Sequence, residues 1–561
     1  MSDYDVIVIG AGPNGLTTGA YMAKAGADVL VIEKRREAGG GLASESEGGF
    51  TYQPHATYHM MADLMPPYHD LNLSQWGIDF YKPDPRVVLH TKDGPLTAYG
   101  EPEKTGESIA NFSEEDAESF KDLFRDSKEA FDEVILPATY EPPVPPGDQT
   151  MMLKDSAAGE RVLEWSEMSY LEIIDSYDIG EPTRALLLYL STMWGIDPKT
   201  TGIGFMFPLY LVRMIECSGL VGGSHRLNTA LHSVIYQNGG RVVDGKIAKD
   251  IVIEDGEAKG VKIEDPVKGE EEYPAPHSAR PGIWVEEGKE EAETITADAI
   301  VSTLNPEQTF LTLIGEENLP DYLHDRVKSW EWEEQSLFNF HIGLRNPPEY
   351  ECGGEKSEIN KALLQIMGVD TSDDILAGYE ELKENKYTDH GHATCYTRYS
   401  PNTAPVRNGN QFHIARWETL APYELQGDPE NWDQMKEEIA GEYMDLWSNY
   451  ASNIDHLGGK LFFTTPLGIE RRFSTMKRGS FKHGEYESLQ MGVNRPHVDC
   501  SDTTTPIDGL FVAGASVYPG GMITLAPGYI AAGKVCEYLG AEKWWEPPEC
   551  VLEAREKGFL P

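Results

Sequence analysis

Three glycines near the start of the chain, Gly10, Gly12 and Gly15, form the pattern GxGxxG. Gly10 permits a tight turn, Gly12 lets the backbone approach a pyrophosphate, and Gly15 allows a helix to pack close to a sheet. Free N–H groups at the start of that helix bind phosphate oxygens. Glu33 follows Gly10 by 23 residues, where a carboxylate accepts hydrogen bonds from ribose hydroxyls and repels a 2′-phosphate. The pattern predicts a dinucleotide site.

Two strands and a helix must position these residues. Residues 4–9 form a β-branched run typical of a buried parallel strand, residues 16–26 have helical content, and residues 28–32 predict a second strand that ends at Glu33. A GxGxxG pattern alone is weak. Flanked by strands and followed by a correctly placed acid, it predicts a Rossmann-like α/β domain with a parallel sheet.

A second glycine cluster, Gly39-Gly40-Gly41, comes soon after Glu33 and leads into Leu42. A nicotinamide nucleotide needs no second close approach of the backbone here. FAD does need one, because its ribityl chain and flavin require a loop without side chains. We therefore predict FAD, and the alternative interpretation is an ordinary flexible turn.

A third glycine-rich segment lies near the other end of the chain. Residues 508–513 predict a strand, residues 514–524 a glycine-rich loop, and residues 525–539 a helix that opens at Pro527-Gly528. These are the parts of a second anion site. In flavoproteins such a helix start can stabilise negative charge that develops on the flavin ring.

Candidates for acid–base chemistry are His55 and His59, which come soon after the second glycine cluster. Either could move a proton alongside a hydride, although a histidine satisfied in a pocket wall is the alternative. His390, His392 and Cys395 could be drawn as a metal site. Since no second ligand pair accompanies them, we predict no metal and a polar strand end. Hydrolase and EF-hand motifs are absent from the sequence.

The composition is strongly acidic, with 93 Asp and Glu against 47 Lys and Arg in 561 residues, a formal charge of −46. This charge disfavours nucleic acid as a partner and opposes adsorption on anionic lipid. A solvated surface, with adaptation to high salt as one cause, explains it. The 40% hydrophobic content and the length allow two to four domains of roughly 150 residues each.

The six cysteines are widely spaced and include no CxxC pair, so we expect a reducing compartment and no disulfide framework. Because the first residues lead directly into a predicted strand, we expect no signal or transit peptide. The longest apolar stretch, residues 203–212, contains a proline and is too short to span a bilayer. We predict a cytoplasmic protein and leave peripheral membrane attachment open. For residues 203–212, a buried core helix and a membrane-facing or tunnel surface are both open.

With these blocks in order, the chain resembles the phytoene desaturase-like flavoproteins of the amine-oxidase superfamily. This family includes carotenoid desaturases, retinol saturase-type reductases and pyridine-oxidoreductase-like relatives. Further blocks that carry the resemblance are residues 220–231, 240–243, 247–256, 300–306, 465–473 and 514–528. Position 41 departs from the pattern, because relatives usually have a basic residue after the glycine pair. Residues 401–410 and an acidic stretch at 264–293, predicted to be a solvated insertion, also depart from it.

The resemblance implies a discontinuous FAD-binding domain built from residues 1–62, 219–303 and 498–541. Residues 63–218 would form a helical lid and substrate region, residues 304–497 a mixed-sheet substrate domain, and residues 542–561 a C-terminal tail. The tail's tryptophans either dock on a partner or membrane or pack back on the chain. The residues implied to bind FAD are Gly10, Gly12, Pro13, Asn14, Gly15, Glu33, Lys34, Gly40, Gly41, Leu42, Ile247, Gly514, Ala515, Gly521, Met522, Ile523 and Thr524.

The function that the resemblance implies is an FAD-dependent oxidoreductase that transfers hydride on an apolar isoprenoid, terpenoid or polyene. Desaturation, saturation, isomerisation and allylic hydroxylation by water all stay open. The alternatives are a flavin amine oxidase and a non-catalytic FAD-binding partner subunit. The electron acceptor, whether quinone, oxygen or redox protein, and a homo- or hetero-oligomeric state also stay open.

Overall fold

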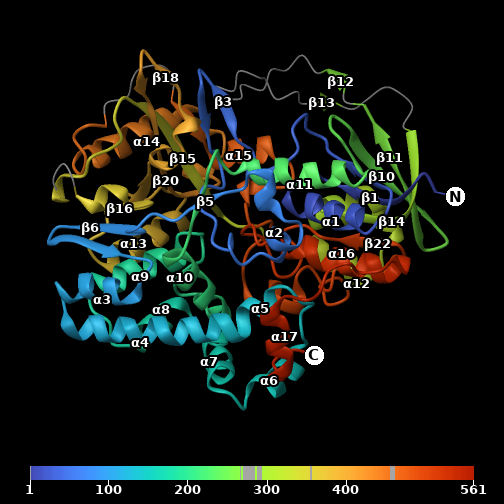
Figure 1. The fold of residues 1–561 in the computed structure, drawn as a ribbon, viewed down its shortest axis with the longest axis horizontal. Helices are drawn as coiled ribbons and strands as arrows, with labels where there is room; N and C mark the ends of the chain where they lie inside the picture. Colours follow the sequence, from blue (N-terminus) through green and yellow to red (C-terminus); the bar gives the residue numbers. More distant parts are fainter. Residues whose placement is uncertain (1, 266, 269–284, 287–292, 354–356, 455–460) are drawn as a thin grey trace.

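The computed structural model describes residues 2–265, 267–268, 285–286, 293–353, 357–454 and 461–561. Within these residues, two seven-stranded sheets lie in different halves of the molecule, and a group of helices lies below the second sheet (Figure 1). Most of the predicted acidic stretch at 264–293 lies outside the described residues.

The first sheet is the predicted Rossmann-like sheet. Four of its strand pairings are parallel, and they run β9–β2–β1–β14–β22. The antiparallel hairpin β10–β11 adds to the first half of β14, while β22 pairs with its second half. The strands are β1 Tyr4–Ile9, β2 Val29–Ile32, β9 Arg241–Val243, β10 Ile247–Glu254, β11 Glu257–Glu264, β14 Glu293–Ser302 and β22 Leu510–Val512.

Both faces of this sheet are covered, which explains the continuous apolar run in its first strand. Val6 and Val8 pack on the face that carries α1 (Pro13–Lys24), whereas Ile7 and Ile9 pack on the opposite face with β10 and β11. The helix α1 lies between α11 (His225–Gln237) and α16 (Ala526–Leu539) (Figure 1). Segments from the start, middle and end of the chain thus meet around one helix.

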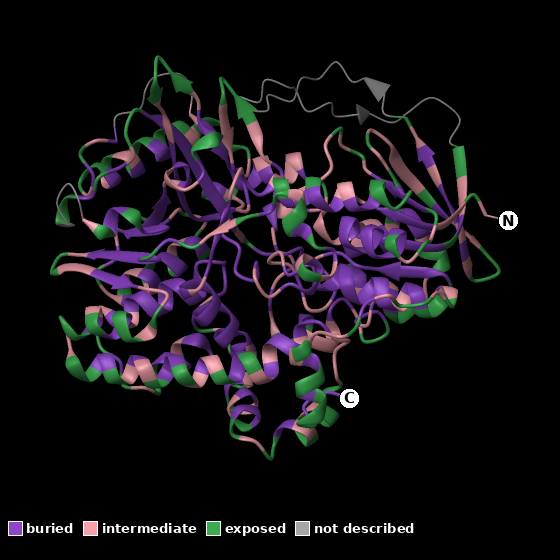
Figure 2. Cartoon of the chain, viewed as in Figure 1, coloured by how far each residue is buried: buried purple, intermediate pink, exposed green. Residues whose placement is uncertain are grey.

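The second sheet is mixed, because β6 and β16 are parallel and its other pairings are antiparallel. One face packs against α14 (Asn431–Ser448) through Trp417, Trp432 and Trp447. The strand order is β21 Phe462–Thr464, β15 Gln335–Leu344, β20 His413–Pro422, β17 Gly391–Thr394, β16 Leu364–Met367, β6 Val87–Thr91 and β7 Gly94–Ala98. Figure 2 shows the strands of the second sheet as largely buried, whereas the β10–β11 hairpin of the first sheet also has exposed and half-buried positions.

The segment 63–218 is mainly helical, as expected, but it also contributes β6 and β7 to the second sheet. Its apolar stretch forms the buried helix α10 (Phe207–Ile215), which confirms the core-helix interpretation. The other helices are α2 Pro66–Asp70, α3 Pro102–Ala110, α4 Glu114–Ala130, α5 Leu136–Thr139, α6 Pro146–Leu153, α7 Ala157–Ser166, α8 Tyr170–Asp175 and α9 Thr183–Thr192. The predicted fold class, a Rossmann-like α/β domain with a mixed-sheet domain and a helical region, is confirmed. The domain boundaries stay a prediction.

The C-terminal tail packs back on the chain. Trp545 is buried, Trp544 donates its indole N–H to the carbonyl of Tyr21 at 3.1 Å, and both rings contact the Tyr21 ring. The short helix α17 (Glu549–Glu556) adds an ion pair between Arg555 and Glu141. The tail is therefore part of the fold around α1.

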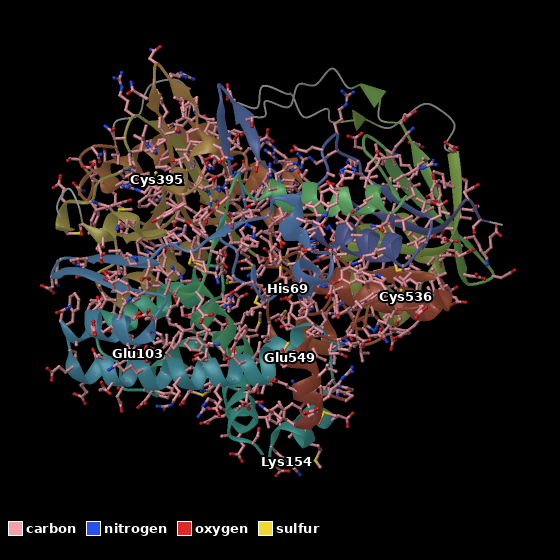
Figure 3. The ribbon with its side chains drawn as sticks, in the orientation of Figure 1. His69, Glu103, Lys154, Cys395, Cys536 and Glu549 are labelled. Atoms are coloured by element: carbon pink, nitrogen blue, oxygen red, sulfur yellow. The ribbon has the colours of Figure 1, made fainter. Side chains whose placement is uncertain are left out.

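All six cysteines are free, and two of them, Cys395 and Cys536, lie in different halves of the molecule (Figure 3). No helix within the described part of the chain is both long and apolar enough to cross a membrane.

Candidate functional site

A cavity of about 1320 Å³ extends from the glycine loop after β1 to the underside of the second sheet. Its outer part is lined by polar groups of the Rossmann-like half, among them Glu33 and Lys34. Its inner part is lined by large apolar side chains, including Trp194 and Leu337. The cavity exceeds the 300–1,000 Å³ usual for one small ligand, so it has room for an extended cofactor and a substrate together.

The first glycine loop forms one wall of this cavity. Gly10 has φ +98° and turns the chain out of β1, and the helix α1 then begins at Pro13 without a side-chain cap among the described residues. A Cβ atom added at Gly12 would meet no described atom within 4 Å, because this position opens on the cavity. A Cβ at Gly15 would lie 2.0 Å from the carbonyl oxygen of Gly10. The two glycines therefore serve different ends, ligand approach at Gly12 and internal packing at Gly15.

Glu33 lies at the end of β2, beside the glycine loop. Its carboxylate accepts one hydrogen bond from the N–H of Ala11 and one from the N–H of Arg35, both at 2.9 Å. Burial raises the pKa of Glu33 above its usual value, and these two donors partly offset the rise. Each carboxylate oxygen keeps acceptor capacity for a ribose hydroxyl. Ile247, at the start of β10, lines the same part of the cavity.

The second glycine cluster packs directly on the first loop. The N–H of Gly39 donates to the carbonyl of Ala11 at 2.7 Å, and a Cβ at Gly40 would lie 3.2 Å from the Cα of Gly12. A Cβ at Gly41 would lie 3.0 Å from the methyl carbon of Met476. The chain thus folds back on itself here, so that Gly40, Gly41 and Leu42 line the cavity beside Gly12.

Two arginines that the sequence analysis did not single out face the cavity near this cluster. Arg35 and Arg472 both lie against the ring of Phe473, with guanidinium carbons 4.8 and 5.4 Å from its centre. Arg472 also pairs with Glu45. Buried N–H groups of both arginines, Nη1 of Arg35 and Nε of Arg472, lack a hydrogen-bond partner among the described residues. Burial, and then the charge of Arg35, lowers the pKa of Arg472 to about 9. The two arginines therefore suit an anionic ligand.

The C-terminal loop forms the wall opposite the second glycine cluster. Ala515 and residues 521–524 line the cavity, whereas Gly514 is packed so tightly on Thr303 that an added Cβ would lie 2.7 Å from its carbonyl oxygen. Met522, Ile523 and Leu525 all have φ values between +58° and +66°. Such left-handed residues cost about 1–3 kcal/mol each and cluster at ligand sites. The strained loop leads directly into α16.

Of the two histidine candidates, only His55 lines the cavity. Neither of its ring nitrogens has a hydrogen-bond partner in the described structure, and burial together with Arg416 and Arg35 lowers its pKa to about 3. His59 is hydrogen-bonded through Nε2 to the hydroxyl of Ser224 at 2.9 Å, away from the cavity lining. His55 is therefore the better candidate for contact with a ligand.

The inner end of the cavity was not anticipated from the sequence. Tyr58 and Trp194 have ring centres 6.3 Å apart, and neither the hydroxyl of Tyr58 nor the indole N–H of Trp194 has a partner in the described part of the chain. The carboxylate of Glu418 lies at this end and pairs with the buried guanidinium of Arg416. Two free donors and one carboxylate thus end a largely apolar pocket. The sequence signal that could have indicated this end of the pocket is the charged pair Arg416 and Glu418, which lies on one face of a strand whose other residues are nearly all buried.

These features fit an extended dinucleotide. The outer part offers a carboxylate for a ribose, an open glycine position, an uncapped helix start and two arginines for phosphates. The strained loop and the inner pocket then lie where the far end of such a cofactor would reach. Of the predicted cofactor residues, Gly15 and Gly514 are not in the lining and support it from behind. No group of three or more potential metal ligands occurs among the residues described.

Comparison with known proteins gives a family context. Residues 8–67 match the family described as NAD(P)-binding Rossmann-like domain. A subunit of limonene dehydrogenase from Castellaniella defragrans is 39% identical over 568 residues, covering 99% of this chain and 98% of that protein. A 4,4'-diapophytoene desaturase (4,4'-diapolycopene-forming) from Methylomonas is 23% identical over 265 residues, covering 46% of this chain and 50% of that protein. Wild-type putrescine oxidase bound to putrescine shares the fold, with a TM-score of 0.55 and 12% identity, covering 95% of this chain and 99% of that chain.

Proposed function

The chain belongs to the phytoene desaturase-like family of flavoproteins, and on that premise we propose that it is an FAD-dependent oxidoreductase that removes hydride from an apolar terpenoid or polyene. The flavin, when bound, accepts the hydride at its N5 atom. The prediction of an oxidoreductase of this family is confirmed by the comparisons. The choice of FAD rests on the fit of Glu33, Gly12 and the two arginines to a dinucleotide.

One observation carries the proposal: the dinucleotide groove and the apolar pocket are parts of the same cavity. Met60, Trp194 and Leu337 line the inner part and are themselves buried, so a bound substrate is shielded from water. An apolar substrate gains about 25 cal/mol for each Å² that it buries there. The residues of this end therefore bind and orient an apolar substrate beside the far end of the cofactor.

The proposal is tested by anaerobic mixing of FAD-loaded protein with limonene, with a carotenoid precursor and with benzylamine, followed by flavin absorbance. We expect bleaching by the terpenoid or the polyene. Bleaching by the amine alone would indicate an amine oxidase, and no bleaching would leave a non-catalytic subunit. Trp194→Ala should change which terpenoid reduces the flavin without changing flavin content. Trp332→Ala, outside the cavity lining, is the matched control.

We further propose that the chain works as one component of a hetero-oligomer that passes electrons to an external acceptor. The support is that its 39% identical relative is named as a subunit of a dehydrogenase. Isolation of the tagged chain from its own source, with cross-linking and mass spectrometry, tests this proposal. A second protein in equal amount is expected, and recovery of the chain alone would contradict the proposal.

A further inference from the structure

A line of polar side chains connects the inner end of the cavity with the surface of the second sheet. It begins at Glu418 on β20 and continues through His392 on β17, since these two residues are paired across the strands. Strand alternation places them on the face that looks toward the cavity, whereas their neighbours Ala393 and Trp417 pack on the opposite face with α14. His390, two residues before His392, completes the tandem histidine motif.

The inner end of this line is a buried and firmly held carboxylate. Glu418 is 2% exposed, and one of its oxygens pairs with Arg416. Arg416 is itself fixed, because it donates to the hydroxyl of Thr57 at 2.8 Å and to the carbonyl of His55 at 3.1 Å. The other oxygen of Glu418 lies 3.5 Å from Nε2 of His392. Arg416 thus occupies Oε2 and leaves Oε1 facing His392.

The middle of the line is formed by groups that can both give and accept a proton. Nδ1 of His392 lies 2.9 Å from the hydroxyl of Tyr189 on α9. Burial lowers the pKa of His392, so its imidazole is neutral. The rings of Tyr189 and His390 have centres 6.1 Å apart. A small cavity of about 20 Å³, lined by Tyr189, His390, His392 and Glu418, has room for one water molecule between them.

The outer end reaches solvent. Nδ1 of His390 lies 3.6 Å from the carboxylate of Asp389, whose side chain is 87% exposed. Room for the His390 ring is left by Gly378 on α13 (Ser372–Lys383), where an added Cβ would lie 2.5 Å from Cε1 of that ring. On the same helix, burial and then the charge of Asp389 raise the pKa of Glu381, and His390 partly offsets this rise.

We propose that Glu418 accepts the proton that the reaction releases, and that His392, Tyr189 and His390 relay it to Asp389 at the surface. This inference rests on the proposed function. One C–H bond of the substrate breaks and its electron pair leaves with the hydride, which reduces the flavin. A neutral product then requires loss of a proton, either from a neighbouring C–H as a C=C bond forms, or from water as a C–O bond forms. In both cases the proton goes to Oε1 of Glu418.

The test is a single anaerobic turnover of the FAD-loaded protein with limonene in weak buffer. Flavin absorbance reports the hydride, and a pH-indicator dye reports the proton in solution. In the unmodified protein both signals should appear together. Glu418→Gln should slow flavin reduction on the order of 100-fold. His390→Leu should delay the dye signal about tenfold behind flavin reduction, and added imidazole should restore it.

Two further variants control for structural damage, because Glu418→Gln leaves Arg416 without its partner. Gly378→Ala should reproduce the delay of His390→Leu with unchanged flavin content. His413→Leu, a half-buried histidine outside both cavities, should leave both signals unchanged. If His390→Leu and Gly378→Ala release the proton as fast as the unmodified protein, the relay is wrong and the oxidoreductase stands. If no terpenoid or polyene reduces the flavin, the proposed function and the relay are both overturned.

Discussion

The two glycines Gly12 and Gly15 make a sharp test of the site, because alanine at each should fail in a different way. At Gly12 the backbone is extended, with φ −71° and ψ 175°, so alanine fits the conformation, and its Cβ would meet no described atom within 4 Å. At Gly15 the Cβ would lie 2.0 Å from a carbonyl oxygen of the chain itself. Gly12→Ala should therefore lower the affinity for the cofactor, and Gly15→Ala should lower the stability of the folded protein.

The magnitudes follow from the contacts. Gly15→Ala forces a backbone shift, which costs about 1–3 kcal/mol or more of unfolding free energy. Gly12→Ala should change the stability of the cofactor-free protein by no more than about 0.5 kcal/mol. If its methyl group costs one charge-assisted hydrogen bond to a phosphate, about 2 kcal/mol, FAD binds about 30-fold more weakly. At an FAD concentration of about 100 times the original Kd, the stabilisation of the folded protein by bound FAD then falls from about 2.7 to about 0.9 kcal/mol.

The assay is thermal and urea unfolding of deflavinated protein, with and without FAD, together with flavin content after purification. We expect Gly12→Ala to unfold like the unmodified protein without FAD and to respond weakly to FAD. Gly15→Ala should be less stable in both conditions. If Gly12→Ala retains full FAD affinity, or if the two variants are equally destabilised without FAD, the assignment of the open wall at Gly12 is refuted.

Three other predictions concern the arginine pair, His55 and the tail. Arg472→Met should weaken FAD binding about tenfold by fluorescence titration, and Arg478→Met, whose guanidinium pairs with Glu424 outside the cavity lining, should leave it unchanged. The pKa of His55 is lowered to about 3 in the folded state, so the unfolded state binds its proton first and stability falls as pH drops below about 6.5. Between pH 6.5 and 5 the titration of this residue lowers the unfolding free energy by about 1.6 kcal/mol, and His55→Gln should abolish this loss in urea unfolding. Deletion of residues 542–561 should lower the unfolding free energy by roughly 3 kcal/mol through loss of the buried Trp545, and an unchanged melting temperature would contradict this.

The Rossmann-like half could be predicted because its signals are local. The strand, glycine loop, helix and Glu33 follow one another within about thirty residues, and each type of residue has one physical task there. The inner pocket could not be predicted in the same way. Tyr58, Trp194 and Glu418 are far apart in the sequence, and alternation on β20 shows only that Glu418 and Arg416 share a face. Which face is buried under a cavity depends on the packing of α9 and α13.

Position 41 illustrates a second limit of local patterns. The resemblance predicts a basic residue there, and glycine instead leaves the flavin side without that cation. In the folded chain the side chain of Met476 fills the space beside Gly41, and Arg472, only four residues earlier, faces the same cavity. A positive charge thus reaches the site from a different segment. A departure from a motif can be compensated in three dimensions at a position that no motif marks.

The two sheets separate the two products of C–H oxidation. The hydride would stay with a cofactor held by the first sheet, whereas the proton leaves along β17 and β20 of the second. This division has an electrostatic reason, since a proton and a reduced cofactor confined in one apolar pocket would attract each other and favour the reverse reaction. Arg416 pairs with Glu418 and so balances the buried charge before the proton arrives. The acidic surface, with its formal charge of −46, then favours the arrival of the proton at Asp389.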